Sequence, residues 1–191
     1  MTTDLLLLPA FYLLGCLTSG YYLVRIFSQT DIREHGHGST GARDVSRVLG
    51  PWGSVATSGL DLMKGAATVW LAGRYGHGAW IMPVGIIVML IGHIWPVQLG
   101  FRGGRGVMPA IGAVGLFDPV LMAVFVILFF VVWLVLRRLT LSGMIVVAFA
   151  PVIAFVFDRS GATMMLLFTI SLLVIIAHWK ILRDDLGIRH F

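Results

Sequence analysis

The first polar segment of the chain gathers glycines, histidines and arginines within a short stretch. It reads Gly36-His37-Gly38-Ser39-Thr40-Gly41-Ala42-Arg43-Asp44-Val45-Ser46-Arg47. Closely spaced glycines let consecutive backbone N–H groups face one anion. Arg47 adds a planar guanidinium that matches a phosphate or a carboxylate. The segment therefore predicts an anion site, and the alternative interpretation is a flexible connector whose arginines only set membrane topology.

A second polar segment has the same character. It contains Gly92-His93-Ile94-Trp95-Pro96 and then Phe101-Arg102-Gly103-Gly104-Arg105-Gly106-Val107, directly before an apolar run. Glycines ahead of a helix leave free N–H groups at its positive end, which favours anions. The Gly-Lys-Ser/Thr ending of a nucleotide-binding P-loop is missing. We expect a second anion site here, and His93 is either part of it or a hydrogen-bonded packing residue.

Ionisable side chains also occur within or at the edge of apolar runs. Asp61 and Lys64 are three residues apart and so share one helix face, where they form a mutual ion pair or let Lys64 reach an anion. His178 ends the last apolar run. The chain shows neither a nucleophile elbow nor metal-ligand spacing, so no metal or cofactor is predicted. Such residues suit transfer from an already activated donor through positioning and electrostatic stabilisation.

The elements that position these residues are predicted to lie in a membrane. Hydrophobic residues make up 58% of the 191 residues, charged residues only 12%, and the mean hydropathy is +0.93. A soluble domain has about a quarter charged residues, and a membrane span needs about 20 apolar residues. We therefore expect an all-α polytopic membrane protein with a single domain, residues 1–191, of about seven helices. The expected helices are Leu5–Ile26, Val55–Gly73, Trp80–Leu99, Val107–Phe117, Val120–Leu136, Ser142–Phe157 and Thr163–Ile181.

Basic residues predict the orientation of these helices. They concentrate after the first, third, fifth and last runs, and the opposite ends hold only Arg74 and Arg159. Under the positive-inside rule the N-terminus lies outside, the C-terminus is cytoplasmic, and both glycine segments face the cytoplasm. The short run Val107–Phe117 must cross the membrane for this alternation to hold.

The two glycine segments and the Asp61-x-x-Lys64-Gly65 motif resemble the PlsY family of bacterial acyl-phosphate:glycerol-3-phosphate acyltransferases. The likeness spans nearly the whole chain. The family has lysines where this chain has Arg102 and Arg105, whereas the first segment matches at Gly36, Gly38, Gly41, Ala42 and Arg47.

The resemblance implies a seven-helix bundle in the bacterial inner membrane with a cytoplasmic active site. It implies acyl transfer from acyl phosphate to glycerol 3-phosphate, giving lysophosphatidic acid for phospholipid synthesis. Expected partners are these substrates, membrane lipids and a soluble enzyme that produces acyl phosphate, and no nucleic acid. Under this acyltransferase hypothesis the candidate catalytic residues are His37, Arg47, Arg105 and His178, and His37 or His178 would orient the acceptor. The phosphate-binding residues implied are Gly36, Gly38, Ser39, Gly41, Lys64, His93, Arg102, Gly103, Gly104 and Gly106.

The chain departs from the family pattern at several positions. His37, Ser39, Arg43 and Asp44 replace the family's Ser, Asn, Thr and Asn, and Ile181 stands where the family has a C-terminal asparagine. These changes leave one alternative open, a catalytically altered or inactive homologue that binds lipid or anions or scaffolds lipid synthesis. A small anion transporter fits less well, because the polar groups gather at one face and no internal repeat is evident.

Overall fold

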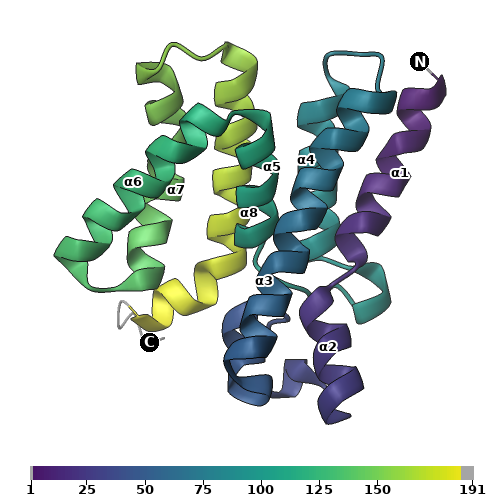
Figure 1. Cartoon of the computed structure of the whole chain (residues 1–191), viewed down its shortest axis with the longest axis vertical. Helices are drawn as coiled ribbons and strands as arrows, with labels where there is room; N and C mark the ends of the chain where they lie inside the picture. Colours follow the sequence, from purple (N-terminus) through teal and green to yellow (C-terminus); the bar gives the residue numbers. More distant parts are fainter. Residues whose placement is uncertain (1, 186–191) are drawn as a thin grey trace.

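The computed structural model describes residues 2–185, and every element in this range is helical (Figure 1). Its elements in chain order are α1 Thr2–Cys16, α2 Ser19–Ser28, the 3-10 turn η1 Ile32–Glu34, α3 Ala42–Tyr75, α4 Ile81–Ile94, the 3-10 turn η2 Val97–Leu99, α5 Val107–Phe117, α6 Pro119–Leu136, α7 Leu139–Val156 and α8 Gly161–Asp185. The predicted all-helical class is thus confirmed.

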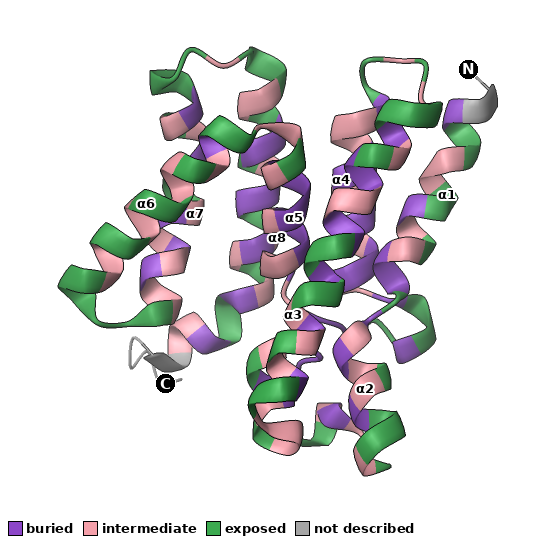
Figure 2. Cartoon of the chain, viewed as in Figure 1, coloured by how far each residue is buried: buried purple, intermediate pink, exposed green. Residues whose placement is uncertain are grey.

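Several helices have the length and composition of membrane spans. Within residues 2–185, five segments qualify: Asp4–Ser28, Ile81–Leu99, Pro119–Leu136, Leu139–Val156 and Gly161–Arg183. The most apolar of them, α6, has a mean hydropathy of 3.0, yet only 6% of this segment is buried within the protein. Figure 2 shows α6 largely exposed along its length. An exposed helix of this apolarity is stable in lipid, where the solvent itself is hydrocarbon.

Glycines bring pairs of helices into close contact. A Cβ atom on Gly65 of α3 would lie 2.0 Å from the carbonyl oxygen of Pro109 in α5, and one on Gly112 of α5 would lie 1.9 Å from that of Leu62. Between α1 and α4, a Cβ on Gly92 would lie 2.2 Å from the Tyr12 oxygen. Small residues of this kind let membrane helices gain packing energy at short range. These contacts hold α3 directly against α5 and α1 directly against α4.

Two predicted helix boundaries were wrong. The first apolar run is broken between Cys16 and Ser19, because the chain bends at Leu17 and Thr18. The helix expected to begin at Val55 begins at Ala42, well inside the first polar segment, and bends at Gly50, where φ is 74°. The first turns of α3 are polar, so the apolar run that predicted this helix begins only after them. The bend at Gly50, which precedes a proline, joins these polar turns to the apolar part of the helix. In contrast, Val107–Phe117 is confirmed at both ends.

The bundle has two distinct ends. In Figure 1 the start of α1 lies at the upper end with the α3–α4 and α7–α8 connections, and the last described turns of α8 lie at the lower end. Asp118, between α5 and α6, caps α6 by accepting from the N–H of Leu121 at 3.0 Å. It also pairs with Arg159 of the α7–α8 connection, Oδ2 to Nε, at 2.7 Å. Hence α5, although short, runs from Gly106 at the second glycine segment to the upper end of the bundle.

Candidate functional site

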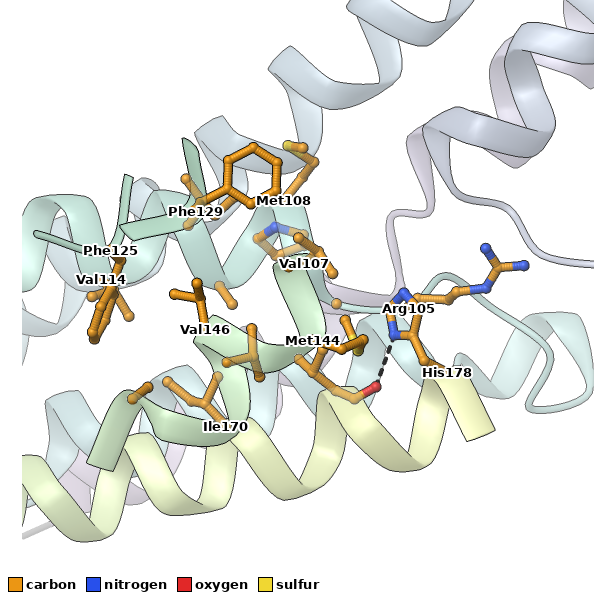
Figure 3. Close-up of a pocket in the computed structure, with 18 of the residues that line it drawn as sticks. Arg105, Val107, Met108, Val114, Phe125, Phe129, Met144, Val146, Ile170 and His178 are labelled. Atoms are coloured by element: carbon orange, nitrogen blue, oxygen red, sulfur yellow. Dashed lines mark hydrogen bonds between the residues drawn. The ribbon is translucent and has the colours of Figure 1, made fainter. Parts of the chain in front are cut away.

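A cavity of about 480 Å³ lies among α5, α6, α7 and α8 (Figure 3). Apolar side chains form most of its wall, among them Met108, Phe125, Phe129, Met144, Val146 and Ile170. Its polar lining includes Arg43, His93, Arg105 and His178. Figure 3 shows Arg105 and His178 together at one end of the cavity, which we call the mouth. The cavity thus joins an apolar chamber to a cationic opening.

Two helices begin at this cavity. Gly41 is the N-cap of α3 and Gly106 is the N-cap of α5, both line the cavity, and neither helix has a hydrogen bond from an N-cap side chain. Gly106 has φ of 81°, a left-handed conformation that favours glycine. The first N–H groups of a helix have no partner within the helix and carry its positive end. The two N-termini and Arg105 therefore create an anion-binding environment.

The fully buried carboxylate of Asp44, 0% exposed, connects three of the predicted catalytic residues. Oδ2 accepts from Nη2 of Arg105 at 3.1 Å. Oδ1 accepts from the backbone N–H of His37 at 3.2 Å and lies 3.0 Å from its Nδ1. Nη1 of Arg47 lies 3.9 Å from Oδ1. Asp44 accordingly links the first glycine segment and α3 to the second glycine loop.

Arg105 is a cation held in a partly dry environment. Burial lowers the pKa of its guanidinium from the usual range, and the Asp44 carboxylate acts against that shift. An arginine nevertheless stays protonated in proteins. Its guanidinium has five N–H donors, and the bond to Asp44 uses one of them. The remaining donors make Arg105 the strongest candidate for holding a phosphate at the mouth.

Lys64 lies behind the cavity wall in a buried polar cluster. Its Nζ is 3.0 Å from Oδ1 of Asp61, donates to the carbonyl oxygen of Leu17 at 2.8 Å, and lies 2.9 Å from Nδ1 of His93. Ser19 also donates to Asp61, at 2.6 Å. An ammonium donates and cannot accept, so Nδ1 of His93 must be the acceptor and its proton is on Nε2. Lys64 thereby sets His93 as a neutral hydrogen-bond donor.

His178 has the opposite arrangement of donor and acceptor. Its Nδ1 lies 2.8 Å from the carbonyl oxygen of Val174, which can only accept. The neutral ring therefore has its proton on Nδ1, and Nε2 is left as an acceptor. Both histidines line the same cavity. One offers a donor and the other an acceptor, although the residue types are identical.

Gly103 and Gly104 of the second glycine segment were predicted to offer free N–H groups to an anion, but the structure gives these N–H groups another role. The N–H of Gly103 donates to the carbonyl oxygen of Ile94, and that of Gly104 donates to the carbonyl oxygen of His93. These N–H groups shape the loop, because they are already bonded to carbonyl oxygens at the end of α4. The carbonyl oxygen of Gly103 in turn accepts from Thr40, so the two glycine segments are joined.

The other predicted residues lie around the site rather than on the cavity wall. Gly36, with φ of 59°, lies close to Asp44 and Arg47: a Cβ there would be 2.5 Å from Oδ1 of Asp44. Ser39 is buried and accepts from the N–H of Gly41, which shapes the turn before α3. A Cβ on Gly38 would lie 3.7 Å from Arg102, whose side chain is exposed.

Sequence reasoning missed the central role of Asp44 and the location of the apolar chamber. Asp44 stood in the sequence as one of several departures from a motif, with no sign of which arginine it would meet. The chamber residues lie on four helices, and a lining residue in an apolar run has the same type as a lipid-facing one. A carboxylate between two arginines in a basic segment was the available signal for Asp44.

The family model described as glycerol-3-phosphate acyltransferase matches residues 5–184. Glycerol-3-phosphate acyltransferase 1 of Desulfitobacterium hafniense (strain Y51) is 36% identical over 184 residues, covering 96% of this chain and 91% of that protein. The glycerol-3-phosphate acyltransferase of Parasynechococcus marenigrum (strain WH8102) is 37% identical over 177 residues, covering 92% and 83%.

Solved structures agree with these sequence matches. The crystal structure of PlsY, an integral membrane glycerol 3-phosphate acyltransferase, in its glycerol 3-phosphate form has a TM-score of 0.86 and 28% identity, covering 98% of this chain and 94% of that one. Its lysophosphatidic acid form has a TM-score of 0.83 and 27% identity. The resemblance seen in the motifs is confirmed, and the chain is a multi-pass membrane protein that belongs to the glycerol-3-phosphate acyltransferase family.

Proposed function

We propose that this protein transfers a fatty acyl group from acyl phosphate to glycerol 3-phosphate and so forms lysophosphatidic acid. The observation that carries the proposal is the cavity among α5–α8, whose wall is apolar and whose mouth holds Arg105, His178 and two helix N-termini. An acyl phosphate has the same division, with a hydrocarbon chain at one end and an anion at the other.

The acyl chain occupies the apolar chamber. Met108 of α5, Phe125 of α6, Met144 of α7 and Ile170 of α8 present only hydrocarbon, aromatic or thioether groups to it. Moving the chain from water into such surroundings is favoured by about 0.8 kcal/mol per buried CH₂ group. The volume of about 480 Å³ falls within the range of about 300–1,000 Å³ for ligand pockets.

The phosphates bind at the mouth. Arg105 contributes its remaining guanidinium N–H groups, and the N-termini of α3 and α5 contribute backbone donors and their positive dipole ends. Nε2–H of His93, held as a donor by Lys64, adds a neutral contact on the same wall. Arg47, whose side chain is 47% exposed, is available to a second phosphate from the solvent side.

The reaction needs no covalent enzyme intermediate. The acceptor hydroxyl attacks the carbonyl carbon of the acyl phosphate, a new C–O ester bond forms, and the C–O bond to phosphate breaks. The electron pair of that bond leaves with inorganic phosphate, which takes up the proton of the hydroxyl. Nε2 of His178 orients the hydroxyl by accepting its hydrogen bond, and Arg105 stabilises the negative charge on the departing phosphate.

The proposal includes seven crossings, with the N-terminus outside and the mouth at the cytoplasmic face of a bacterial inner membrane. The five long spans, together with the part of α3 after Gly50 and the short α5, make this number. The basic residues near the mouth end fit the positive-inside rule. A cytoplasmic mouth would receive glycerol 3-phosphate from solution and acyl phosphate from a soluble enzyme that produces it.

The test is an acyl-transfer assay on purified protein in detergent or nanodiscs, with labelled glycerol 3-phosphate and palmitoyl phosphate, run beside palmitoyl-CoA. Labelled lysophosphatidic acid from palmitoyl phosphate alone is the expected result. Product from palmitoyl-CoA alone would show that the acyl donor is acyl-CoA and not acyl phosphate. Absence of product from both, in protein that unfolds cooperatively on heating, would contradict the proposed activity.

A further inference from the structure

The carboxylate of Asp44 occupies donors at the place where a phosphate is expected. It is fully buried, it accepts from Nη2 of Arg105 at 3.1 Å, and it lies 3.9 Å from Nη1 of Arg47. The backbone N–H of His37, at 3.2 Å, and Nδ1 of the same residue, at 3.0 Å, complete its surroundings. A carboxylate and a phosphate oxygen present the same chemistry to a guanidinium.

The loop around this carboxylate is built for close approach. Gly36 has φ of 59°, and a Cβ at that position would lie 2.5 Å from Oδ1 of Asp44 and 2.9 Å from Arg47. A residue other than glycine would therefore push against both charged groups. The backbone of the first glycine segment closes over Asp44, which keeps the carboxylate away from water and directed at Arg105.

A buried negative charge beside Arg105 has two effects on an incoming phosphate. It takes one N–H of the guanidinium, and it repels the phosphate across a short, poorly screened distance. We propose that Asp44 is an internal anion that partly neutralises Arg105 and Arg47 and thereby limits how tightly the site holds phosphate. Weak retention suits a site that must release inorganic phosphate after each transfer. The inference rests on the proposed function only in assigning a phosphate to the mouth.

The experiment measures binding of inorganic phosphate to purified, full-length protein by isothermal titration calorimetry at constant ionic strength. Asp44→Asn keeps the shape and one acceptor oxygen but removes the charge, so phosphate should bind about tenfold or more tightly. Asp31→Asn is the matched control, because Asp31 also pairs with an arginine, Arg33, but neither lines the cavity. Its phosphate affinity should equal that of the wild type. Equal or weaker phosphate binding by Asp44→Asn would overturn the proposal.

A double-mutant cycle identifies the arginine through which Asp44 acts. In an Arg105→Gln background, Asp44→Asn should tighten phosphate binding by a smaller factor than in the wild type, because one of the two guanidinium groups that Asp44 neutralises is gone. An undiminished gain there would contradict the assigned route. If Asp44→Asn does not fold, Asp44→Ser removes the same charge with a smaller side chain and carries the same expectation.

Turnover provides an independent readout. In the acyl-transfer assay Asp44→Asn should be inhibited by inorganic phosphate at about tenfold lower concentrations than the wild type, while Asp31→Asn is inhibited as the wild type is. Failure of acyl transfer in every variant, together with tighter phosphate binding by Asp44→Asn, would reject the proposed activity and leave this inference standing. Normal acyl transfer with unchanged phosphate binding by Asp44→Asn would support the proposed activity and reject this inference.

Discussion

At the scale of single residues, hydrogen-bond partners decide what each polar side chain can do. His93 and His178 line one cavity, but an ammonium faces Nδ1 of the first and a carbonyl oxygen faces Nδ1 of the second. The first ring is therefore a donor and the second an acceptor at Nε2. Arg105 likewise keeps most of its donors, since Asp44 takes one. The division of roles follows from these neighbours.

Arg105 is expected to be required for transfer. Arg105→Ala removes the cation at the mouth, and losing a preorganised charge of this kind costs on the order of a hundredfold to a thousandfold in kcat. Arg105→Lys keeps the charge without the planar fork and should retain part of the activity. Steady-state kinetics with palmitoyl phosphate measures both variants, and Arg74→Ala, at an exposed position outside the cavity, is the comparison. Full activity of Arg105→Ala would remove Arg105 from the mechanism.

His178 is expected to act on the acceptor hydroxyl. His178→Phe keeps a ring of similar size but has no acceptor, so kcat should fall by on the order of a hundredfold. The control is His35→Phe, because His35 is exposed and does not line the cavity. Both variants are measured with saturating palmitoyl phosphate over a range of glycerol 3-phosphate concentrations. An unchanged kcat in His178→Phe would mean that the ring only fills space.

At the scale of helices, the site depends on how closely α3 and α5 approach. Gly65 follows Lys64 directly, and its lack of a side chain lets the carbonyl of Pro109 come within reach of the α3 backbone. The same contact fixes Lys64 behind His93 and places the start of α5 at the cavity. The motif Asp61-x-x-Lys64-Gly65 thus combines a polar cluster with a packing contact in one helical turn.

Substitution of Gly65 is expected to destabilise the bundle. In Gly65→Val a Cβ would lie 2.0 Å from the Pro109 oxygen, so the helices must separate, and overpacking of this kind costs about 1–3 kcal/mol or more. Gly59→Ala is the matched control in the same helix, because no atom lies within 4 Å of its added Cβ. That change should be neutral or stabilise by about 0.5–1 kcal/mol. Thermal unfolding in detergent compares the two, and equal melting temperatures would refute the packing argument.

At the scale of the whole molecule, the apolar chamber is lined by four successive helices, α5, α6, α7 and α8. Ala150 of α7 lines it and is 5% exposed, and it lies between one and two turns beyond Met144, further from the mouth end of that helix. Ala150→Phe should fill this part and shift the preference toward shorter acyl phosphates. The control Val152→Phe adds the same ring on the exposed side of α7. Competition between acyl phosphates of different length measures the shift, and an unchanged preference would place the chain elsewhere.

The proposed orientation makes a separate prediction. In a Cys16→Ser background, Ala79→Cys lies in the α3–α4 connection and Arg138→Cys in the α6–α7 connection, both at exposed positions. A membrane-impermeant maleimide added to intact spheroplasts should label Ala79→Cys, and should label Arg138→Cys only after the membrane is opened. The reverse pattern would invert the topology, and labelling of both in intact spheroplasts would reject an odd number of crossings between them.

The sequence by itself determined that the protein folds in a membrane and is helical, and it identified the two glycine segments that contain the arginines of the site. Hydropathy and glycine spacing are local properties, so Val107–Phe117 and the Arg105 loop could be predicted without a structure. Helix α3 could not be bounded in this way, because its first turns are polar and its bend at Gly50 has no hydropathy signal.

Only the tertiary structure decided which charges meet. Asp44 reaches Arg105 across 61 positions of the chain, and Lys64 reaches His93 across 29. Neither pairing has a sequence signal, because the energy of an ion pair or hydrogen bond depends on distance and burial in space. The chamber also could not be predicted from the sequence, since its lining residues are apolar like their lipid-facing neighbours. The sequence therefore specified the chemical groups, and helix packing through glycines specified the arrangement in which they face a substrate.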